Sequence, residues 1–310
     1  MIRRLDYFSK AILNRFLPEY FHKTRTQNLL KSIQNGSTKT EIENHVSYLN
    51  KLNTIVDIKT NSTISAFSNS NRPSLYQLDL LEYARGFGRN LPIAYEFGDI
   101  THIPPVPTIV KSRPIKGKNQ NSILFPLDKL RHLIFMEDKQ PWENKKPFAT
   151  YRGRPNNWKR TALVDQYYNH PNHDIGFVHA PDSPEKCRPW LSRKEQLDFR
   201  YILSIEGDDV ATNLKWIMSS NSIAVSPPLV YETWFMEGLL KPGIHYIEIK
   251  EDVSDLEEKI NYYEQHPKEA LSIIENANNW TKKFANKETE RLLATLVLKK
   301  YFEFTNSFLD

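Results

Sequence analysis

The second half of the chain alternates between short apolar runs and segments in which apolar residues recur at helical spacing. The apolar runs are expected to form strands, at residues 148–152, 174–178, 201–206, 222–226 and 245–249. The helical segments between or after them are 157–169, 209–220, 232–240 and 255–266, and Ser254 with Glu257 gives the last one a capping-box pattern. This alternation predicts a parallel sheet whose strands are connected by crossover helices.

Length and a change of texture near residue 145 predict two domains. A chain of 310 residues with 39% apolar residues is long enough to build two cores of ordinary size. The segment 139–147 is polar, contains two prolines and is the expected boundary. We therefore expect an N-terminal domain at 1–145, a Rossmann-like domain at 146–285, and a C-terminal helix at 286–310 that packs back on the first domain. Strand-like pieces of the first domain are 54–58, 93–97 and 108–111.

Cysteine content and hydropathy indicate the compartment. Cys187 is the only cysteine, so neither an intramolecular disulfide nor a cysteine zinc site can form, which favours a reducing compartment. The chain has no run of 18 or more apolar residues, and its first residues lack the apolar core of a signal peptide. We expect a cytoplasmic protein.

The net charge of +5, from 42 basic and 37 acidic residues, fits an anionic partner or an ordinary solvated surface. Acidic residues dilute the basic ones almost everywhere, which disfavours the dense basic stripe of a nucleic-acid-binding protein. The helical pattern of residues 2–17 mixes apolar and basic residues and has two interpretations. Either the helix lies on an anionic membrane surface, or it docks on its own domain. The second interpretation is favoured, because the basic face is diluted by Asp6, Ser9 and Asn14.

One stretch has the layout of a nucleotide pocket. In residues 201–216 an apolar run ends in Glu206-Gly207-Asp208-Asp209 and turns into a helical pattern, which would place backbone N–H groups and a helix N-terminus against a phosphate. Another predicted strand ends in Tyr151-Arg152-Gly153-Arg154, and Arg160 follows in the next helix. Guanidinium groups in this position suit a pyrophosphate, because each one can donate two parallel hydrogen bonds to phosphate oxygens.

The ordered set of motifs resembles glycosyltransferase family 90, which includes bacterial lipopolysaccharide and capsule sugar transferases and eukaryotic protein O-glucosyltransferases. The matching pieces are Tyr151 to Arg154 with Arg160, then residues 201–216, 231–235, 239–249 and 252–256. Upstream, residues 97–100, 111–115 and 121–124 are similar to the bacterial lipopolysaccharide branch. The resemblance implies an α/β fold of GT-B type, with two Rossmann-like domains facing a cleft. It also implies an inverting, metal-independent transfer of a hexose from a UDP-sugar, with no cofactor.

The resemblance also implies roles for single residues. Asp99 matches the catalytic aspartate, which would take the proton of the acceptor hydroxyl. Arg154 matches the arginine that binds the pyrophosphate of the donor. Further residues on the donor side are Arg152, Gly153 and Arg160 beside Arg154, and Gly207, Asp208, Asp209, Asn213 and Lys215 in the loop and helix that would hold the nucleotide.

Three assignments follow from charge. Acidic groups repel a diphosphate, and the eukaryotic branch has an arginine and small apolar residues in the region of Glu206 to Asp209, so Glu206 is expected to bind ribose hydroxyls instead. Glu232 stands at a predicted helix start, where it binds a sugar or ribose hydroxyl or complements the helix dipole. Lys111, Ser112 and Arg113 would face an anionic acceptor, with surface basic residues as the alternative.

Other chemistry has less support in the sequence. Glu206 to Asp209 also has the form of an acidic metal motif of the other glycosyltransferase architecture, but it follows a whole domain. His170 and His173 lack further ligands nearby, so we predict no metal. An epimerase would need a glycine-rich turn near the N-terminus, where Gly36 is the only glycine before Gly86. The alternative class is a protein that binds nucleic acid or another anionic polymer without catalysis.

The expected partners are therefore a nucleotide sugar and a bacterial lipooligosaccharide core or capsule acceptor, and no nucleic acid. The eukaryotic protein-modifying branch of the family usually has several cysteines and works in the secretory pathway, which a chain with one cysteine does not resemble. The expected place of action is the cytoplasmic face of the inner membrane, where the positive charge would favour peripheral contact with anionic lipid.

Overall fold

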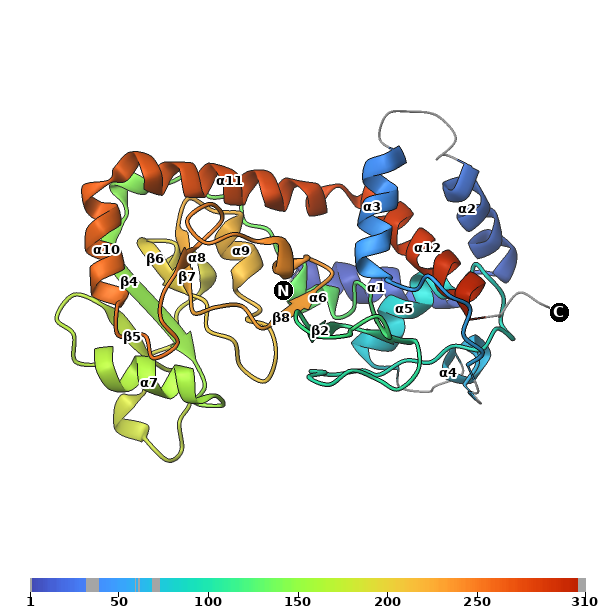
Figure 1. Ribbon diagram of the computed structural model, residues 1–310, viewed down its shortest axis with the longest axis horizontal. Coiled ribbons are helices and arrows are strands. Elements are labelled where there is room, and N and C mark those ends of the chain that lie inside the picture. Colours follow the sequence, from blue (N-terminus) through green and yellow to red (C-terminus); the bar gives the residue numbers. More distant parts are fainter. Residues whose placement is uncertain (1, 32–38, 59, 61, 69–72, 306–310) are drawn as a thin grey trace. The chain divides into compact units, whose positions relative to one another are not determined.

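The computed structural model describes residues 2–31, 39–58, 60, 62–68 and 73–305. Contacts within the chain divide it into two compact units (Figure 1). Unit 1 comprises Met1–His132, Tyr231–Met236 and Asn286–Asp310, and unit 2 comprises Leu133–Val230 and Glu237–Ala285. Each unit is thus built from segments that are far apart in the sequence.

Unit 2 is built on a five-stranded parallel sheet. Its strands are β4 (Lys146–Gly153), β5 (Asp174–Phe177), β6 (Phe199–Leu203), β7 (Ile223–Ser226) and β9 (Ile247–Glu248), in the order β5-β4-β6-β7-β9. Each strand overlaps one of the five predicted from the sequence, and the predicted parallel sheet is confirmed. Counted along the chain, the order is 2-1-3-4-5, one of the two common orders of doubly wound sheets.

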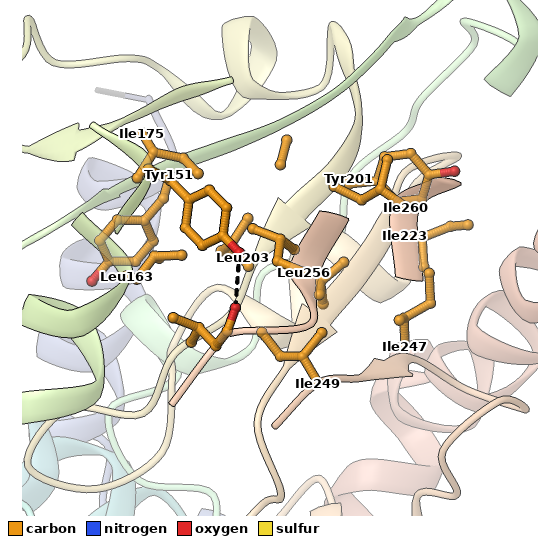
Figure 2. Close-up of a cluster of buried hydrophobic side chains, with 14 of the residues drawn as sticks. Tyr151, Leu163, Ile175, Tyr201, Leu203, Ile223, Ile247, Ile249, Leu256 and Ile260 are labelled. Atoms are coloured by element: carbon orange, nitrogen blue, oxygen red, sulfur yellow. Dashed lines mark hydrogen bonds between the residues drawn. The ribbon is translucent and has the colours of Figure 1, made fainter. Parts of the chain in front are cut away.

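Helices cover this sheet. Helix α7 (Trp158–Tyr167) packs against β5, whereas α9 (Leu214–Met218) and α11 (Pro267–Ala285) pack against β7, and α10 (Leu256–Gln265) packs against α11. Figure 2 shows the apolar cluster that results, in which strand residues such as Leu203 and Ile223 lie with helix residues such as Leu163. Burying each such side chain stabilises the fold by about 1.5–3 kcal/mol, so the two layers form one core. Shorter elements of unit 2 are α8 (Arg193–Gln196) and the 3-10 helices η2 (Trp142–Asn144), η3 (Pro184–Lys186) and η4 (Glu237–Leu239).

Three local predictions were wrong. The helix expected at 209–220 covers only α9, because the carbonyl of Asp209 accepts the N–H of Gly207 and closes a turn there. The helix expected at 232–240 is strand β8 (Tyr231–Thr233) followed by η4. These residues are extended because β8 pairs with residues 112–114, a strand distant in the sequence. The capping box also does not form, since the Ser254 hydroxyl donates to Asp252 (2.8 Å) and Asp255 is the N-cap of α10.

Unit 1 is mainly helical. Its helices are α1 (Ile2–Phe16), α2 (Glu19–Lys31), α3 (Lys39–Leu49), α4 (Ile64–Ser68), α5 (Leu75–Ala84), α6 (Lys129–His132) and α12 (Lys287–Phe304). Strands β1 (Thr108–Val110) and β3 (Ser122–Leu124) pair in parallel, and β2 (Ser112–Pro114) pairs antiparallel with β8. The strand-like pieces at 54–58 and 93–97 form no strand, and the described part of unit 1 holds only two-stranded sheets. A Rossmann-like sheet is therefore described in unit 2 only.

The division into units differs from the predicted boundary at residue 145. Residues 133–145 belong to unit 2 because polar contacts fix them there. The backbone N–H of Met136 donates to Ser219 (2.8 Å), and the Asp138 carboxylate accepts from Lys145 (2.8 Å) and from the backbone of Asn221 (2.9 Å). The polar, proline-containing segment is therefore part of a domain and not a linker. Helix α12 packs against α2, α3 and α5 of unit 1.

A buried acid joins α12 to the segment that carries β8. Glu290 accepts a hydrogen bond from the indole N–H of Trp234 through Oε2, and its Oε1 has no hydrogen-bond partner among the described residues. Burial raises the pKa of Glu290 to about 8, and this effect outweighs the indole bond and the charge of Lys129, which both lower it. The carboxyl group is therefore protonated at neutral pH in the folded protein.

We expect the free energy of unfolding to fall between pH 6 and 8 because of this group. The folded state holds the proton more tightly than the unfolded chain, in which the pKa is near 4.5. The stabilisation is complete below that value and is lost as the pH rises toward 8, by at most about 1.4 kcal/mol per pH unit. Glu290→Gln keeps an oxygen for the indole and should remove this slope in urea unfolding at pH 6, 7 and 8. Parallel pH profiles for wild type and variant would contradict the assignment.

Candidate functional site

The carboxyl ends of β4 and β6 form the place in unit 2 where a ligand is expected. β4 and β6 are neighbours, but the chain leaves β4 through α7 toward β5 and leaves β6 through α9 toward β7. The two loops therefore depart in opposite directions, and sheets of this order bind ligands in the crevice between such loops. The loop after β4 carries Arg154, and the loop after β6 carries Glu206 and Gly207.

Side chains at the start of α7 hold the loop after β6. Asn157 caps α7 by accepting the N–H of Lys159 (2.9 Å), and its amide donates to the Gly207 carbonyl (3.0 Å). Arg160 donates twice to the Ile205 carbonyl (3.1 and 2.9 Å) and once to Asn156 (2.6 Å). The guanidinium predicted to bind the donor is thus occupied in fixing the loop, and it acts there as a positioning group.

Both predicted glycines stand where a side chain would collide. A Cβ on Gly207 would lie 2.8 Å from the Arg160 guanidinium, and a Cβ on Gly153 would lie 2.1 Å from the Tyr151 hydroxyl. Glycine therefore lets the Tyr151 ring of the same strand and the Arg160 guanidinium of α7 pack directly against the backbone at these two positions. Burial raises the pKa of Tyr151 to about 12, so its hydroxyl stays neutral.

The two arginines beside Gly153 differ in what they contact. Arg152 is buried, and its guanidinium donates to the Asp174 carboxylate (2.6 Å), to the Asp174 carbonyl (2.8 Å) and to the Pro189 carbonyl (2.8 Å). These bonds give the Arg152 guanidinium a structural role, and its contact with the donor stays a prediction. Arg154 is exposed, and within the described residues it has neither a hydrogen bond nor an ion pair. It is the uncommitted cation at the end of β4, just before the N-terminus of α7.

The acidic loop after β6 is held from both ends. Glu206 is buried and accepts the backbone N–H of Val230 (3.1 and 3.3 Å), whereas Asp208 is exposed and Asp209 is buried. Asn213 donates to the Leu203 carbonyl (2.9 Å) and accepts from the Ser204 hydroxyl (3.1 Å). Asn213 therefore shapes the loop from within.

The predicted donor residue Lys215 is also internal. Its ammonium group contacts the Glu237 carboxylate at 2.7 Å, and both side chains are buried. The sequence predicted a helix-borne lysine facing phosphate. The structure instead uses this lysine to neutralise a buried carboxylate that lies further along the chain in η4.

In unit 1 the predicted base Asp99 is fixed but accessible. Its carboxylate forms an ion pair with the buried ammonium group of Lys111 and is about one third exposed. Gly98 precedes it with φ +117°, a backbone conformation that favours glycine. The Ser112 hydroxyl donates to the Ile100 carbonyl (3.3 Å) on the other side. Lys111 and Ser112 therefore hold the loop of Asp99, and both are buried, while their expected contact with an acceptor stays a prediction.

Three stacked aromatic rings lie beside this loop, and sequence reasoning missed them. Phe97 stacks on Tyr95 with ring centroids 4.5 Å apart, and on Tyr76 of α5 at 5.6 Å. All three are half-buried, so ring area remains accessible. The alternation of Tyr95 and Phe97 was the only signal for this stack in the sequence, because Tyr76 comes from a separate helix.

Arg113 and Glu232 form a buried ion pair, and their predicted roles toward an acceptor and a donor sugar stay predictions. Their side chains are 0% and 1% exposed, and Arg113 Nε donates to Glu232 Oε1 at 2.8 Å. The Tyr48 hydroxyl also donates to Glu232, and other Arg113 N–H groups reach the carbonyls of Tyr48, Ser122 and Leu49. Four of the five Arg113 N–H groups and both Glu232 oxygens thus have partners within unit 1, where the pair serves the fold.

One cluster in unit 2 has the composition of a metal site. Ligand atoms of His170, His173 and Glu257 lie within 4.8 Å of one another. However, Nδ1 of His170 accepts the N–H of His173 (3.2 Å), and Nδ1 of His173 accepts the N–H of Ala149 (3.2 Å). Each Nε2 therefore carries the ring proton and points it at Glu257. His173 Nε2 is within hydrogen-bond distance of the Glu257 carboxylate, whereas His170 Nε2 lies 3.6 Å from it, and either nitrogen would have to be deprotonated to bind a metal.

Comparison with known proteins identifies the family. The model of "Glycosyl transferase family 90" matches residues 123–306, more than half of the chain, and Asp99 lies outside that match. "O-glucosyltransferase LpsA" of Dichelobacter nodosus is 42% identical over 262 residues, which cover 84% of this chain and 82% of the relative. "Protein O-glucosyltransferase 2" of Danio rerio is 31% identical over 145 residues, 43% of this chain and 28% of that protein. "Protein O-glucosyltransferase 3" of Homo sapiens is 26% identical over 171 residues, 52% of this chain and 33% of that protein. With this match and a relative that is similar along more than four fifths of both chains, the protein belongs to glycosyltransferase family 90 and is a glycosyltransferase.

Proposed function

We propose that the protein transfers a hexose from a UDP-sugar to a hydroxyl group of a lipooligosaccharide core or capsule acceptor, with inversion and without a metal. The observation that carries the donor side is Arg154 at the end of β4, an exposed guanidinium with no hydrogen bond or ion pair among the described residues, on one of two loops that depart in opposite directions. A guanidinium there, beside the N-terminus of a ten-residue helix, supplies the positive potential that a leaving diphosphate needs. In the proposal Glu206 binds the ribose.

The acceptor side of the proposal rests on Asp99. The acceptor oxygen attacks the anomeric carbon while its proton passes to the Asp99 carboxylate, and the bond to the diphosphate breaks on the opposite face. Lys111 keeps the carboxylate in place. The accessible area of the stacked rings of Tyr76, Tyr95 and Phe97 suits the apolar face of a sugar.

The finer parts of the proposal have separate supports. The relative named O-glucosyltransferase supports glucose as the first hexose to test. The lipooligosaccharide or capsule acceptor and the cytoplasmic face of the inner membrane rest on the resemblance of residues 97–124 to the bacterial branch and on the single cysteine. The GT-B arrangement stays a prediction.

Replacing Arg154 with Ala is expected to weaken UDP binding by about 10- to 100-fold, the loss of one or two charge-assisted hydrogen bonds. The measurement is thermal unfolding with UDP, UDP-glucose, UDP-galactose, GDP and CMP. A nucleotide at about 100 times its dissociation constant stabilises a protein by roughly 2.7 kcal/mol. We expect UDP and one UDP-hexose to stabilise the wild type.

The matched control is Arg193→Ala, which changes an exposed arginine in α8. Helix α8 leads into the amino end of β6, whereas the candidate site lies at the carboxyl ends of the strands. This variant should bind UDP as the wild type does. Equal affinity of the Arg154 variant and the control would remove Arg154 from the site. A wild type that responds to no nucleotide would contradict the donor class itself.

A further inference from the structure

The first helix of the chain packs on unit 1 through the side that carries the half-buried residues Tyr7, Phe8, Ala11 and Asn14. The Tyr7 hydroxyl donates to Asp79 (2.8 Å) of α5, and Arg85 donates to the carbonyls of Asn14 (2.9 Å) and Leu17 (3.1 Å). These bonds fix the helix by the face that carries Tyr7 and Asn14. The interpretation that the helix docks on its own domain is therefore correct for one face only.

The opposite face of α1 is apolar and exposed. At about 100° per residue, Leu5, Ile12 and Phe16 fall within about 40° of one another and roughly opposite Tyr7. Leu5, Ile12, Leu13 and Phe16 are 65%, 51%, 66% and 78% exposed. An amphipathic helix of a soluble domain normally turns such residues inward. Here no described residue covers the apolar face.

The exposed apolar residues continue into the first turn of α2. Together they form the N-terminal apolar surface, defined as Leu5, Ile12, Leu13, Phe16, Leu17, Tyr20 and Phe21. A groove of about 730 Å³ beside it is lined by Tyr20, Phe21 and residues of α2 and α12, including Arg25, Arg291 and Glu288. A continuous patch of this kind marks a site of contact with a protein or a membrane.

The charge of the same segment indicates which partner. Residues 1–31 hold seven of the 42 Lys and Arg residues but only two of the 37 Asp and Glu residues, so they account for the whole net charge of +5. A second copy of this surface would bring like charges together, which disfavours self-association. An anionic bilayer offers negative headgroups and an apolar interior side by side, so it matches both properties.

We propose that the N-terminal apolar surface docks in the plane of a bilayer that contains anionic phospholipid. The apolar side chains enter the boundary between headgroups and acyl chains, and the net positive charge of residues 1–31 favours the anionic headgroups. Within the described residues, no helix has the length and apolar character needed to cross a membrane. The proposed contact is therefore peripheral and goes beyond the transferase reaction.

The test is co-flotation of the full chain with vesicles, without nucleotide or acceptor. We expect binding to vesicles of 70% phosphatidylcholine and 30% phosphatidylglycerol, weakening as salt rises, and little binding to pure phosphatidylcholine. Phe16→Glu should lower the partition coefficient by about tenfold or more. The change removes an aromatic ring that the bilayer would bury, and it adds a negative charge that the anionic headgroups repel. The measurement does not depend on catalysis, so its outcome is separate from that of the proposed function.

The matched control is Ile55→Glu, which places the same charge on an equally exposed apolar residue of unit 1 outside this surface. It should bind within about twofold of the wild type, and both variants should unfold within about 0.5 kcal/mol of it. Three results would overturn the proposal. They are a wild type that ignores anionic vesicles, equal binding of the two variants, and a dimer in sedimentation velocity that Phe16→Glu abolishes while no vesicle binds.

Discussion

Asp99→Asn is expected to lower the rate of hexose transfer by about 10²- to 10⁴-fold while leaving UDP affinity unchanged. An amide has nearly the same shape as a carboxylate and can still accept a hydrogen bond from Lys111, but it cannot take up a proton. The loss should therefore appear in kcat. Rates are measured with purified lipooligosaccharide and the UDP-hexose that stabilises the wild type, and UDP affinity is measured by thermal unfolding.

The matched control for Asp99 is Asp57→Asn, which changes an exposed acid of unit 1 in the same way. It should transfer hexose at the wild-type rate. The Asp99 position needs this comparison because it lies before the segment that the family model matches. A rate for Asp99→Asn within threefold of the control would assign the base to another residue, and a loss of UDP affinity in parallel would indicate a structural defect.

The sheet of unit 2 could be predicted because its signals are local. Strands such as Tyr201 to Leu203 are buried on both faces and appear as continuous apolar runs, and the residues between them have helical spacing or turn composition. Gly153 and Gly207 lie where side chains of Tyr151 and Arg160 pack against the backbone, and their part in donor binding stays a prediction. Local order thus predicted the sheet and the positions of the loops that follow its strands.

The assignment of charged side chains could not be predicted, because their partners are distant in the sequence. Arg152 and Arg154 are alike in a motif, and only the fold brings Asp174 to one of them. Glu232 appeared to begin a helix, yet it lies in β8 opposite Arg113, 119 residues away. Strand β8 has only three residues, which are too few to show the alternation of apolar and polar residues that is typical of a strand. Its pairing with β2 could therefore not be predicted from the sequence.

The pair of Arg113 and Glu232 leads to the largest expected effect on stability. Glu232→Gln and Arg113→Met should each lower the free energy of unfolding by about 3–5 kcal/mol, because each leaves a charge buried without its partner. Arg113→Met should cost more, since it also removes the donors to the carbonyls of Tyr48, Ser122 and Leu49. The double variant Arg113→Met/Glu232→Gln should lose less than the sum of the two single variants, because no lone charge remains.

Urea unfolding of the four proteins gives this cycle, with Glu303→Gln as the control. Glu303 pairs with Lys299 on the surface of α12, where both side chains are 43% exposed, and the change there should stay below about 0.5 kcal/mol. The result also decides between two roles for Glu232. A large loss of stability with normal UDP affinity means that Glu232 holds β8 to β2. A Glu232→Gln protein of wild-type stability with weakened UDP binding would return this residue to the donor site that the sequence first indicated.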